Sequence, residues 1–214
     1  MSVTPSKHKG THIVIEGQDA TGKSTQAKML ADYLRAQGQN VIHYSEAGTD
    51  SDDPFVAKIA ELTYGSKQNI DHCTRVMLYL INRYEQWRKL AVPTLENGGT
   101  VITTRSWLST LIYEGYNGGV SRELISRLHR AVMPSCYFSP DHVVILTLSD
   151  QAHAKRLADQ GARQLEFWKS KPDTFQKKIN QTYFDIAKEF NIPTLDAFGS
   201  IEEVQRNLRK MFGL

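Results

Sequence analysis

The residues best suited to chemistry lie in one short stretch near the start of the chain. Residues 17–24 read G-x-x-x-x-G-K-S, the pattern of a phosphate-binding loop. Gly17 and Gly22 permit backbone conformations that most residues resist, so the N–H groups of the loop can converge on phosphate oxygens. Lys23 is expected to reach the β- and γ-phosphates of a nucleotide, and the Ser24 hydroxyl to hold Mg²⁺. The predicted triphosphate site comprises Gly17, Gln18, Asp19, Ala20, Thr21, Gly22, Lys23, Ser24 and Thr25.

The segments on either side of this loop suit the same role. Residues 11–16 form a short apolar run with β-branched residues, which is typical of a buried strand. After the loop, Ala27, Leu30, Ala31 and Leu34 recur at the spacing of one buried helix face. The loop therefore leads from a strand into a helix N-terminus, where the helix dipole favours an anion.

Strands and helices alternate along the rest of the chain. Strands are also expected at residues 40–44, 100–104, 140–148 and 192–195, helices at 55–64, 71–91, 108–116, 121–132, 151–159, 173–190 and 201–212, and a turn at 93–99. The run at 140–148 is almost continuously apolar, like a central strand of a parallel sheet. This pattern predicts an α/β fold with a five-stranded, mainly parallel sheet and helices on both faces, in one domain spanning residues 1–214.

Composition excludes several classes of protein. The 214 residues are 40% hydrophobic, enough for one core, and the net charge of +3 is too balanced to indicate nucleic-acid binding. No run approaches the length of a membrane span, and residues 1–9 lack the apolar stretch of a signal peptide. Cys73 and Cys136 match neither a metal spacing nor a disulfide framework, and the seven histidines show no metal spacing either. We therefore expect a cytoplasmic protein with reduced cysteines.

Three stretches together resemble the thymidylate kinases, a family of P-loop nucleoside monophosphate kinases. IEGQDATGKSTQ is close to the family's E-G-x-D-G-x-G-K-S-T-Q, LYLINRYEQW to its L-L-F-x-x-N/D-R-x-x-Q helix, and TTRSWLSTLIYEGY to its D-R-Y-x-x-S-x-x-A-Y-Q-G. The likeness runs from about residue 11 to residue 190. It implies the three-layer P-loop NTPase fold, ATP as phosphate donor, Mg²⁺ as cofactor, a nucleoside monophosphate as acceptor, and a homodimer.

The resemblance also implies roles for residues on the acceptor side. Asp19 matches an acid that lies near the sugar and phosphate of the acceptor. Tyr79 takes the place of a phenylalanine that stacks on thymine, a role that any aromatic face can fill. Arg83 matches an arginine that hydrogen-bonds the base. The pattern alone leaves Arg83 either solvated on the outer helix face or pointing into a ligand site.

Further residues follow from the third stretch and from the lid of the family. Arg105 corresponds to an arginine that bridges phosphates, and Ser109 and Tyr113 to residues that line the acceptor pocket. Residues about 160–171 correspond to a mobile lid, with Arg163 as its cation. The implied catalytic set is Lys23, Arg105, Asp19 and Arg163, because phosphoryl transfer depends on positioning and on cationic stabilisation of the transferring group.

Three departures from the family pattern concern the metal and the acceptor. Thr104 stands where the family has an aspartate that helps to organise Mg²⁺, and Glu114 stands where it usually has glutamine. The loop at 45–48 reads S-E-A-G where the family has R-E-P-G. We hypothesise that Glu46, which follows the second strand and borders the acceptor, supplies the missing carboxylate for the metal.

The predicted reaction is phosphoryl transfer from ATP to a pyrimidine deoxynucleoside monophosphate, with dTMP as the first candidate. Two alternatives stay open. A deoxynucleoside kinase would share the glycine loop and the Arg105-Ser106 pair, and would use Glu46 as the base for a 5′-hydroxyl. A P-loop switch or ATPase would need an aspartate at a strand end, which Thr103-Thr104 does not provide.

Overall fold

A five-stranded parallel sheet forms the centre of the molecule in the computed structural model, which describes residues 8–65, 70–160 and 173–214. The strands lie in the order β2-β3-β1-β4-β5, and each neighbouring pair is parallel. Their bounds are β1 Thr11–Gly17, β2 Val41–Ser45, β3 Thr100–Thr104, β4 His142–Thr147 and β5 Thr194–Asp196. The predicted α/β fold is confirmed, with a sheet that is parallel throughout.

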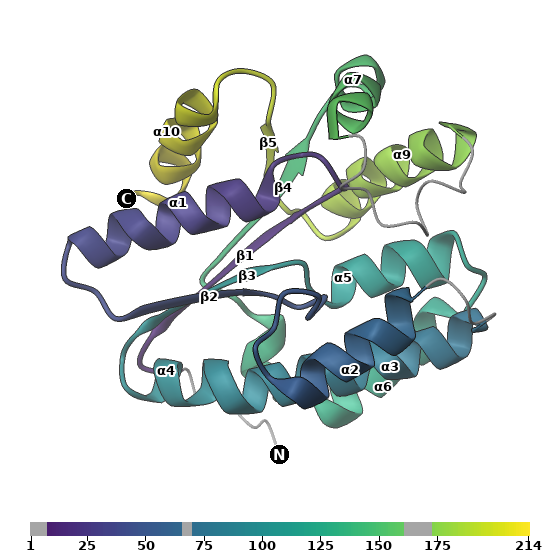
Figure 1. Cartoon of the computed structure of the whole chain (residues 1–214), viewed down its shortest axis with the longest axis horizontal. Coiled ribbons are helices and arrows are strands. Elements are labelled where there is room, and N and C mark those ends of the chain that lie inside the picture. The colour runs from purple at the N-terminus through teal and green to yellow at the C-terminus, as the bar shows by residue number, and fades with distance from the viewer. Residues whose placement is uncertain (1–7, 66–69, 161–172) are drawn as a thin grey trace.

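Helices cover both faces of the sheet (Figure 1), which gives the predicted three layers. On one face, α1 (Lys23–Ala36) and α10 (Ile201–Phe212) pack against the strands and share one apolar core with them. The opposite face carries two further cores. The helices that contribute to them or flank them are α2 Pro54–Tyr64, α3 His72–Gln86, α4 Val92–Glu96, α5 Trp107–Thr110, α6 Arg122–Val132 and α9 Asp173–Glu189. The chain also forms α7 (Asp150–Gln160), π-helical turns at Trp87–Ala91 and Leu111–Tyr116, and a 3₁₀ turn at Ser135–Phe138.

The central strand β1 sends alternate side chains to the two faces. Ile13 and Ile15 enter the core beneath α1 and α10. His12 instead packs against Trp87 and Tyr137 on the opposite face, with ring centroids 5.1 and 6.3 Å away. Because successive side chains of a strand alternate, Glu16 also faces this second layer, close to where the strand ends.

The strand order places a ligand crevice at one edge of the sheet. β1 pairs with β3 on one side and with β4 on the other. In an open parallel sheet the loops diverge at such a switch point, and ligands bind outside the carboxyl ends of the strands. The loops after β1, β2 and β3 carry residues 18–22, 46–53 and 105–106, which include several of the predicted site residues.

Two sequence predictions for residues 71–99 were wrong in detail. The helix expected at 71–91 ends at Gln86, and a π-helical turn and α4 continue it to Glu96. Pro93 was expected to turn the chain, but it lies inside α4. Proline lacks the N–H of an ordinary helical residue and its ring crowds the preceding turn, and the wider π-helical turn just before it relieves both problems. The chain turns after Glu96, and Gly98 adopts a positive φ of 77°.

The remaining strand and helix bounds agree with the prediction to within two or three residues. Among the described residues, no helix is both long enough and apolar enough to cross a membrane. Arg163 and the lid expected at about 160–171, apart from Gln160 at the end of α7, lie outside the described residues.

Candidate active site

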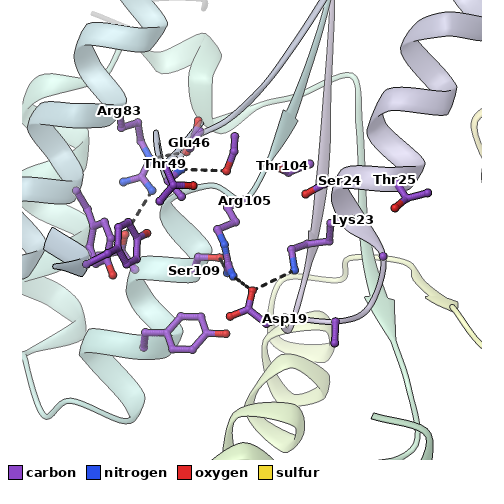
Figure 2. A pocket seen from close by; sticks show the side chains of 18 of the residues that line it. Asp19, Lys23, Ser24, Thr25, Glu46, Thr49, Arg83, Thr104, Arg105 and Ser109 are labelled. Atoms are coloured by element: carbon purple, nitrogen blue, oxygen red, sulfur yellow. Dashed lines mark hydrogen bonds and ion pairs between the residues drawn. The ribbon is translucent and has the colours of Figure 1, made fainter. Parts of the chain in front are cut away.

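A cavity of about 390 Å³ opens at the carboxyl edge of the sheet. Figure 2 shows side chains from the loops after β1, β2 and β3 converging on it, together with side chains from α1 and α3. Its walls are formed by Asp19, Ala20, Gly22, Lys23, Ser24, Thr25, Ser45, Glu46, Ala47, Thr49, Tyr64, Tyr79, Arg83, Thr104, Arg105, Ser109, Thr110, Tyr113, Leu157 and Gln176.

The glycine loop leaves the N-terminus of α1 available to an anion. Gly22 caps the helix with φ 91°, a left-handed conformation that suits glycine. A side chain at Gly17 would place its Cβ 2.5 Å from the Leu146 carbonyl, so that position requires glycine too. The first turn of α1 has no side-chain cap and no acidic residue. Its free N–H groups and the helix dipole therefore favour a phosphate.

Lys23 is held over the loop. Its side chain is 7% exposed, and its Nζ donates to the Gln18 carbonyl at 2.6 Å and lies 3.9 Å from Asp19 Oδ1. Burial, and then the nearby Arg105, lower the pKa of Lys23 to about 7. A bound phosphate would favour the charged form of this lysine, so binding a nucleotide and charging Lys23 are coupled.

Asp19 and Arg105 form an ion pair on the cavity wall, and Lys23 approaches the same oxygen of the carboxylate (Figure 2). Desolvation alone would raise the pKa of Asp19, but Arg105, Lys23 and His153 together hold that pKa below its usual range. Arg105 follows β3 with a φ of 70°, a left-handed conformation that is strained for a non-glycine residue. Its Nη1 donates to Ser109 Oγ at 3.2 Å, and its guanidinium lies 5.6 Å from the Tyr113 ring centre. This backbone conformation directs the Arg105 guanidinium toward the cavity.

Glu16 lies behind the cavity and holds the cavity residue Ser109 in place. The side chain is fully buried, and Oε1 accepts from Ser106 Oγ at 2.8 Å and from Ser109 N at 3.3 Å. Oε2 accepts from Ser109 Oγ at 2.8 Å, from Gly17 N at 3.3 Å and from Tyr183 Oη at 3.4 Å. One carboxylate thus joins the glycine loop, the turn after β3 and α9. Sequence reasoning assigned no role to Glu16, although an acid that closes an apolar strand is a usable signal.

A second arginine, Arg83, lies in a buried polar cluster on the other side of the cavity. Its Nε donates to Glu46 Oε2 at 2.5 Å, and Tyr137 Oη donates to the same oxygen at 3.0 Å. Burial raises the pKa of Glu46, and the contacts with Arg83 and Tyr137 limit that rise. The pattern alone left two placements for Arg83, and the structure selects the one that points into the site.

Two tyrosines provide an aromatic wall near Arg83. Tyr79 from α3 and Tyr64 from α2 lie with ring centroids 5.7 Å apart, and both line the cavity. Such a surface can hold the flat face of a base. Tyr64 was not predicted, because nothing in the sequence indicates that the end of α2 folds over α3.

Most of the predicted site residues come together in this cavity. Three predicted members of the loop, Gly17, Gln18 and Thr21, do not line it. Gln18 instead donates from Nε2 to the Gln176 carbonyl and side chain at 2.9 and 2.8 Å, and Thr21 Oγ1 donates to the Gln18 carbonyl at 2.8 Å. Thr49, Thr110, Leu157 and Gln176 are wall residues that sequence reasoning missed. Thr110 falls at a variable position of the third stretch, and nothing in the sequence marks the other three as wall residues.

The oxygen atoms of the cavity fit a magnesium ion. Among the described residues, no group of three His, Cys, Asp or Glu side chains could hold a metal on its own. Mg²⁺ needs little protein, since it keeps several waters and usually takes one or two carboxylates along with substrate phosphates. Ser24 is exposed at the start of α1, and the buried Glu46 Oε1 has no hydrogen-bond partner among the described residues. Both residues line the cavity.

This fold and site define a P-loop kinase of the nucleoside monophosphate kinase class. A family model described as thymidylate kinase matches residues 15–208. The thymidylate kinase of Caldicellulosiruptor saccharolyticus is 31% identical over 208 residues, which cover 95% of this chain and 96% of that protein. The probable thymidylate kinase of Thermococcus gammatolerans is 33% identical over 205 residues, covering 93% and 94%. The chain therefore belongs to the thymidylate kinase family.

A solved structure shares the fold as well. The thymidylate kinase from Ehrlichia chaffeensis superposes with a TM-score of 0.72 at 22% identity, covering 96% of this chain and 99% of that one.

Proposed function

We propose that the protein transfers the γ-phosphoryl group of ATP to dTMP, forming dTDP and ADP. The observation that carries the proposal is that one cavity joins the uncapped start of α1 with Arg105, Arg83 and the aromatic wall. The bond between the γ-phosphorus and the β–γ bridging oxygen breaks, and an oxygen of the acceptor phosphate bonds to the same phosphorus. No general base is required, because the acceptor oxygen is already anionic.

Each wall of the cavity has a distinct task in this reaction. Lys23 and the N–H groups of the loop hold the donor phosphates. Arg105 stabilises charge on the transferring group, and Asp19 keeps Arg105 in place. Tyr79 and Tyr64 hold the acceptor base, and Arg83 orients it. We assign the catalytic roles to Lys23, Arg105 and Asp19 on these grounds.

The test is an ADP-release assay with ATP and a panel of acceptors. We expect turnover with dTMP and little with thymidine, whereas a deoxynucleoside kinase would prefer thymidine. Arg105→Met should lower kcat by about 10²-fold or more, the scale found when one stabilising donor is removed. Arg88→Met, at a side chain that is 53% exposed in the π-helical turn that follows α3, is the matched control and should leave kcat unchanged. Failure to phosphorylate any monophosphate would refute the proposal.

We also propose that Ser24 and Glu46 organise Mg²⁺ at the donor phosphates. A magnesium ion there would neutralise charge on the β- and γ-phosphates. Glu46→Gln keeps an oxygen for Arg83 and Tyr137 but removes the negative charge from the cavity. The Mg²⁺ concentration for half-maximal rate should rise about tenfold or more, as for other residues that support a metal. Glu114→Gln, a buried carboxylate that does not line the cavity, is the control. Equal Mg²⁺ dependence in both variants would exclude Glu46.

A homodimer is the assembly we propose. Its support is an apolar stripe on α3, where Met77, Ile81 and Tyr84 share one helix face and are 50%, 43% and 39% exposed. Light scattering after gel filtration should show a dimer that Ile81→Glu dissociates. Ile201→Glu, at a 52% exposed site on α10, should leave it intact. A monomeric wild-type protein at micromolar concentration would contradict this.

We also propose a cytoplasmic location, where Cys73 and Cys136 would remain the free thiols seen here. Cell fractionation tests this location.

A further inference from the structure

Arg83 is surrounded by hydrogen-bond acceptors from four separate elements. Besides Glu46, its Nη2 donates to the Ser106 carbonyl at 2.9 Å and, at a longer 3.4 Å, to Thr110 Oγ1. Its Nη1 lies 2.7 Å from Nε2 of His129, on α6. The Arg83 side chain is only 3% exposed, although it contributes to the cavity wall. A guanidinium has five N–H donors and no acceptor. The four contacts therefore leave one Nη1 hydrogen without a partner among the described residues.

The neighbours of His129 determine where its proton lies. An arginine can only donate, so His129 Nε2 must accept from Arg83 and carries no hydrogen. On the other side of the ring, Nδ1 lies 2.7 Å from the Ile125 carbonyl, one helical turn earlier. A carbonyl can only accept, so Nδ1 carries the hydrogen. The two contacts thus select the same tautomer of a neutral imidazole.

The surroundings of His129 keep it neutral. The side chain is fully buried. Burial, and then the positive charge of Arg83, lower the pKa of His129 to about 3. A protonated ring would carry a hydrogen on Nε2 and would face Arg83 cation to cation. At any pH where the enzyme works, this histidine is therefore a fixed acceptor rather than an acid or a base.

From this geometry we propose that His129 is a positioning residue for the acceptor nucleotide, acting through Arg83. The inference rests on the proposed function, in which Arg83 contacts the acceptor. Glu46 and Ser106 anchor the Nε and Nη2 edges of the guanidinium, and His129 anchors Nη1. Nη1 also carries the remaining hydrogen. His129 thus holds the Nη1 edge, and with it the direction in which that hydrogen points; without His129 only the Nε and Nη2 edges stay anchored.

Two substitutions at His129 separate positioning from packing. In a helix, the Gln side chain brings its terminal group close to where Nε2 lies, whereas the shorter Asn reaches only the place of Nδ1. His129→Gln therefore retains an acceptor for Arg83, and His129→Asn loses it. Loss of one hydrogen bond to a charged group corresponds to about tenfold or more in affinity. We expect His129→Asn to raise the KM and the Kd for dTMP about tenfold, with the KM for ATP unchanged and His129→Gln close to wild type.

A purely structural role predicts a different result. His129→Asn and His129→Gln would then lower the melting temperature alike and would affect dTMP and ATP equally, which would overturn the proposal. A double-mutant cycle gives an independent check. If His129 acts through Arg83, His129→Asn should change dTMP affinity far less in an Arg83→Lys background than in the wild-type background. Additive losses would also refute the proposal.

A spectroscopic measurement keeps this test separate from the proposed function. In ¹⁵N spectra of histidine-labelled enzyme without ligand, the His129 signals should be those of the neutral tautomer with hydrogen on Nδ1. Arg83→Lys should shift its Nε2 signal. A different tautomer, or an Nε2 signal that does not shift in Arg83→Lys, overturns the positioning role. If wild-type enzyme accepts no dTMP but the tautomer is as stated, the proposed substrate fails while the contact between His129 and Arg83 stands.

Discussion

Replacing Glu16 with glutamine tests whether one buried carboxylate holds the site together. Glu16 accepts hydrogen bonds from Ser106, Ser109, Gly17 and Tyr183, and Ser109 in turn accepts from Arg105. Glutamine has nearly the same shape but offers only one oxygen. The substitution therefore removes an acceptor behind the cavity residue Ser109 without leaving a void.

The expected cost follows from the contacts of the two oxygens. One accepts from the Ser109 N–H and the other from the Gly17 N–H, both at 3.3 Å. Whichever way the new amide is turned, its NH₂ faces one of these backbone donors, and a buried unsatisfied N–H costs about 1–3 kcal/mol. The remaining hydrogen bonds also lose the strength that a charged acceptor gives them. Together these losses should lower the free energy of unfolding by at least about 2 kcal/mol, or the Tm by about 4–8 °C for a chain of this size.

Urea unfolding and steady-state kinetics on the same variant measure both consequences. Because Ser109 links Glu16 to Arg105, Glu16→Gln should lower kcat as well as stability, and Ser109→Ala should lower kcat in the same direction. Glu61→Gln, at a side chain that is 67% exposed, is the control and should alter neither property. If Glu16→Gln unfolds within about 0.5 kcal/mol of wild type, the carboxylate does not organise the loop and the turn as argued.

Three further predictions concern stability and the donor site. His12 and His129 are both buried, and burial lowers the pKa of each to about 3. Below pH 6.5 the unfolded chain therefore binds more protons than the folded chain. The free energy of unfolding should fall as the pH drops toward 3, by about 1.4 kcal/mol per pH unit for each histidine. In urea unfolding measured across this pH range, His12→Phe should reduce that slope by about half. An unchanged slope would contradict the contribution assigned to His12. Ser200→Ala breaks the capping box with Glu203 and should cost about 1 kcal/mol by thermal melting without changing turnover. Lys23→Met should lower kcat/KM for ATP by a factor on the order of 10² in the ADP-release assay, and a near-normal value would remove Lys23 from the donor site.

Local pattern was enough to predict the elements of the fold. The apolar strand at residues 11–16, the glycine loop and the helix after it were all found where they were expected. The same reasoning failed at Pro93, because a proline signal does not reveal that a π-helical turn upstream can absorb it. Such accommodation depends on how Trp87 and Ala91 pack against the sheet, which is tertiary information.

The cavity wall could be predicted only where residues belong to a motif. Asp19, Arg83 and Arg105 were found through the resemblance, and they line one cavity. Glu16 and His129 were missed, since neither role exists until distant segments meet: Glu16 lies 93 residues from Ser109, and His129 lies 46 from Arg83. A lone histidine in an amphipathic helix carries no sign that its Nε2 will face an arginine.

The acid that the family has at the end of β3 is absent here, so a carboxylate that organises the metal must come from another residue. Thr104 closes β3, and its carbonyl already accepts from Glu46 N at 3.1 Å. Glu16 is nearby, but both of its oxygens are occupied. Asp19 is paired with Arg105. Among the described residues of the wall, that leaves Glu46 Oε1 as the buried carboxylate oxygen without a partner. If this chain keeps the metal chemistry of its family, Glu46, which the family's R-E-P-G loop also has, would serve in place of the acid missing at the end of β3. The Glu46→Gln titration therefore decides between a site in which Glu46 organises the metal and a site that works without a carboxylate.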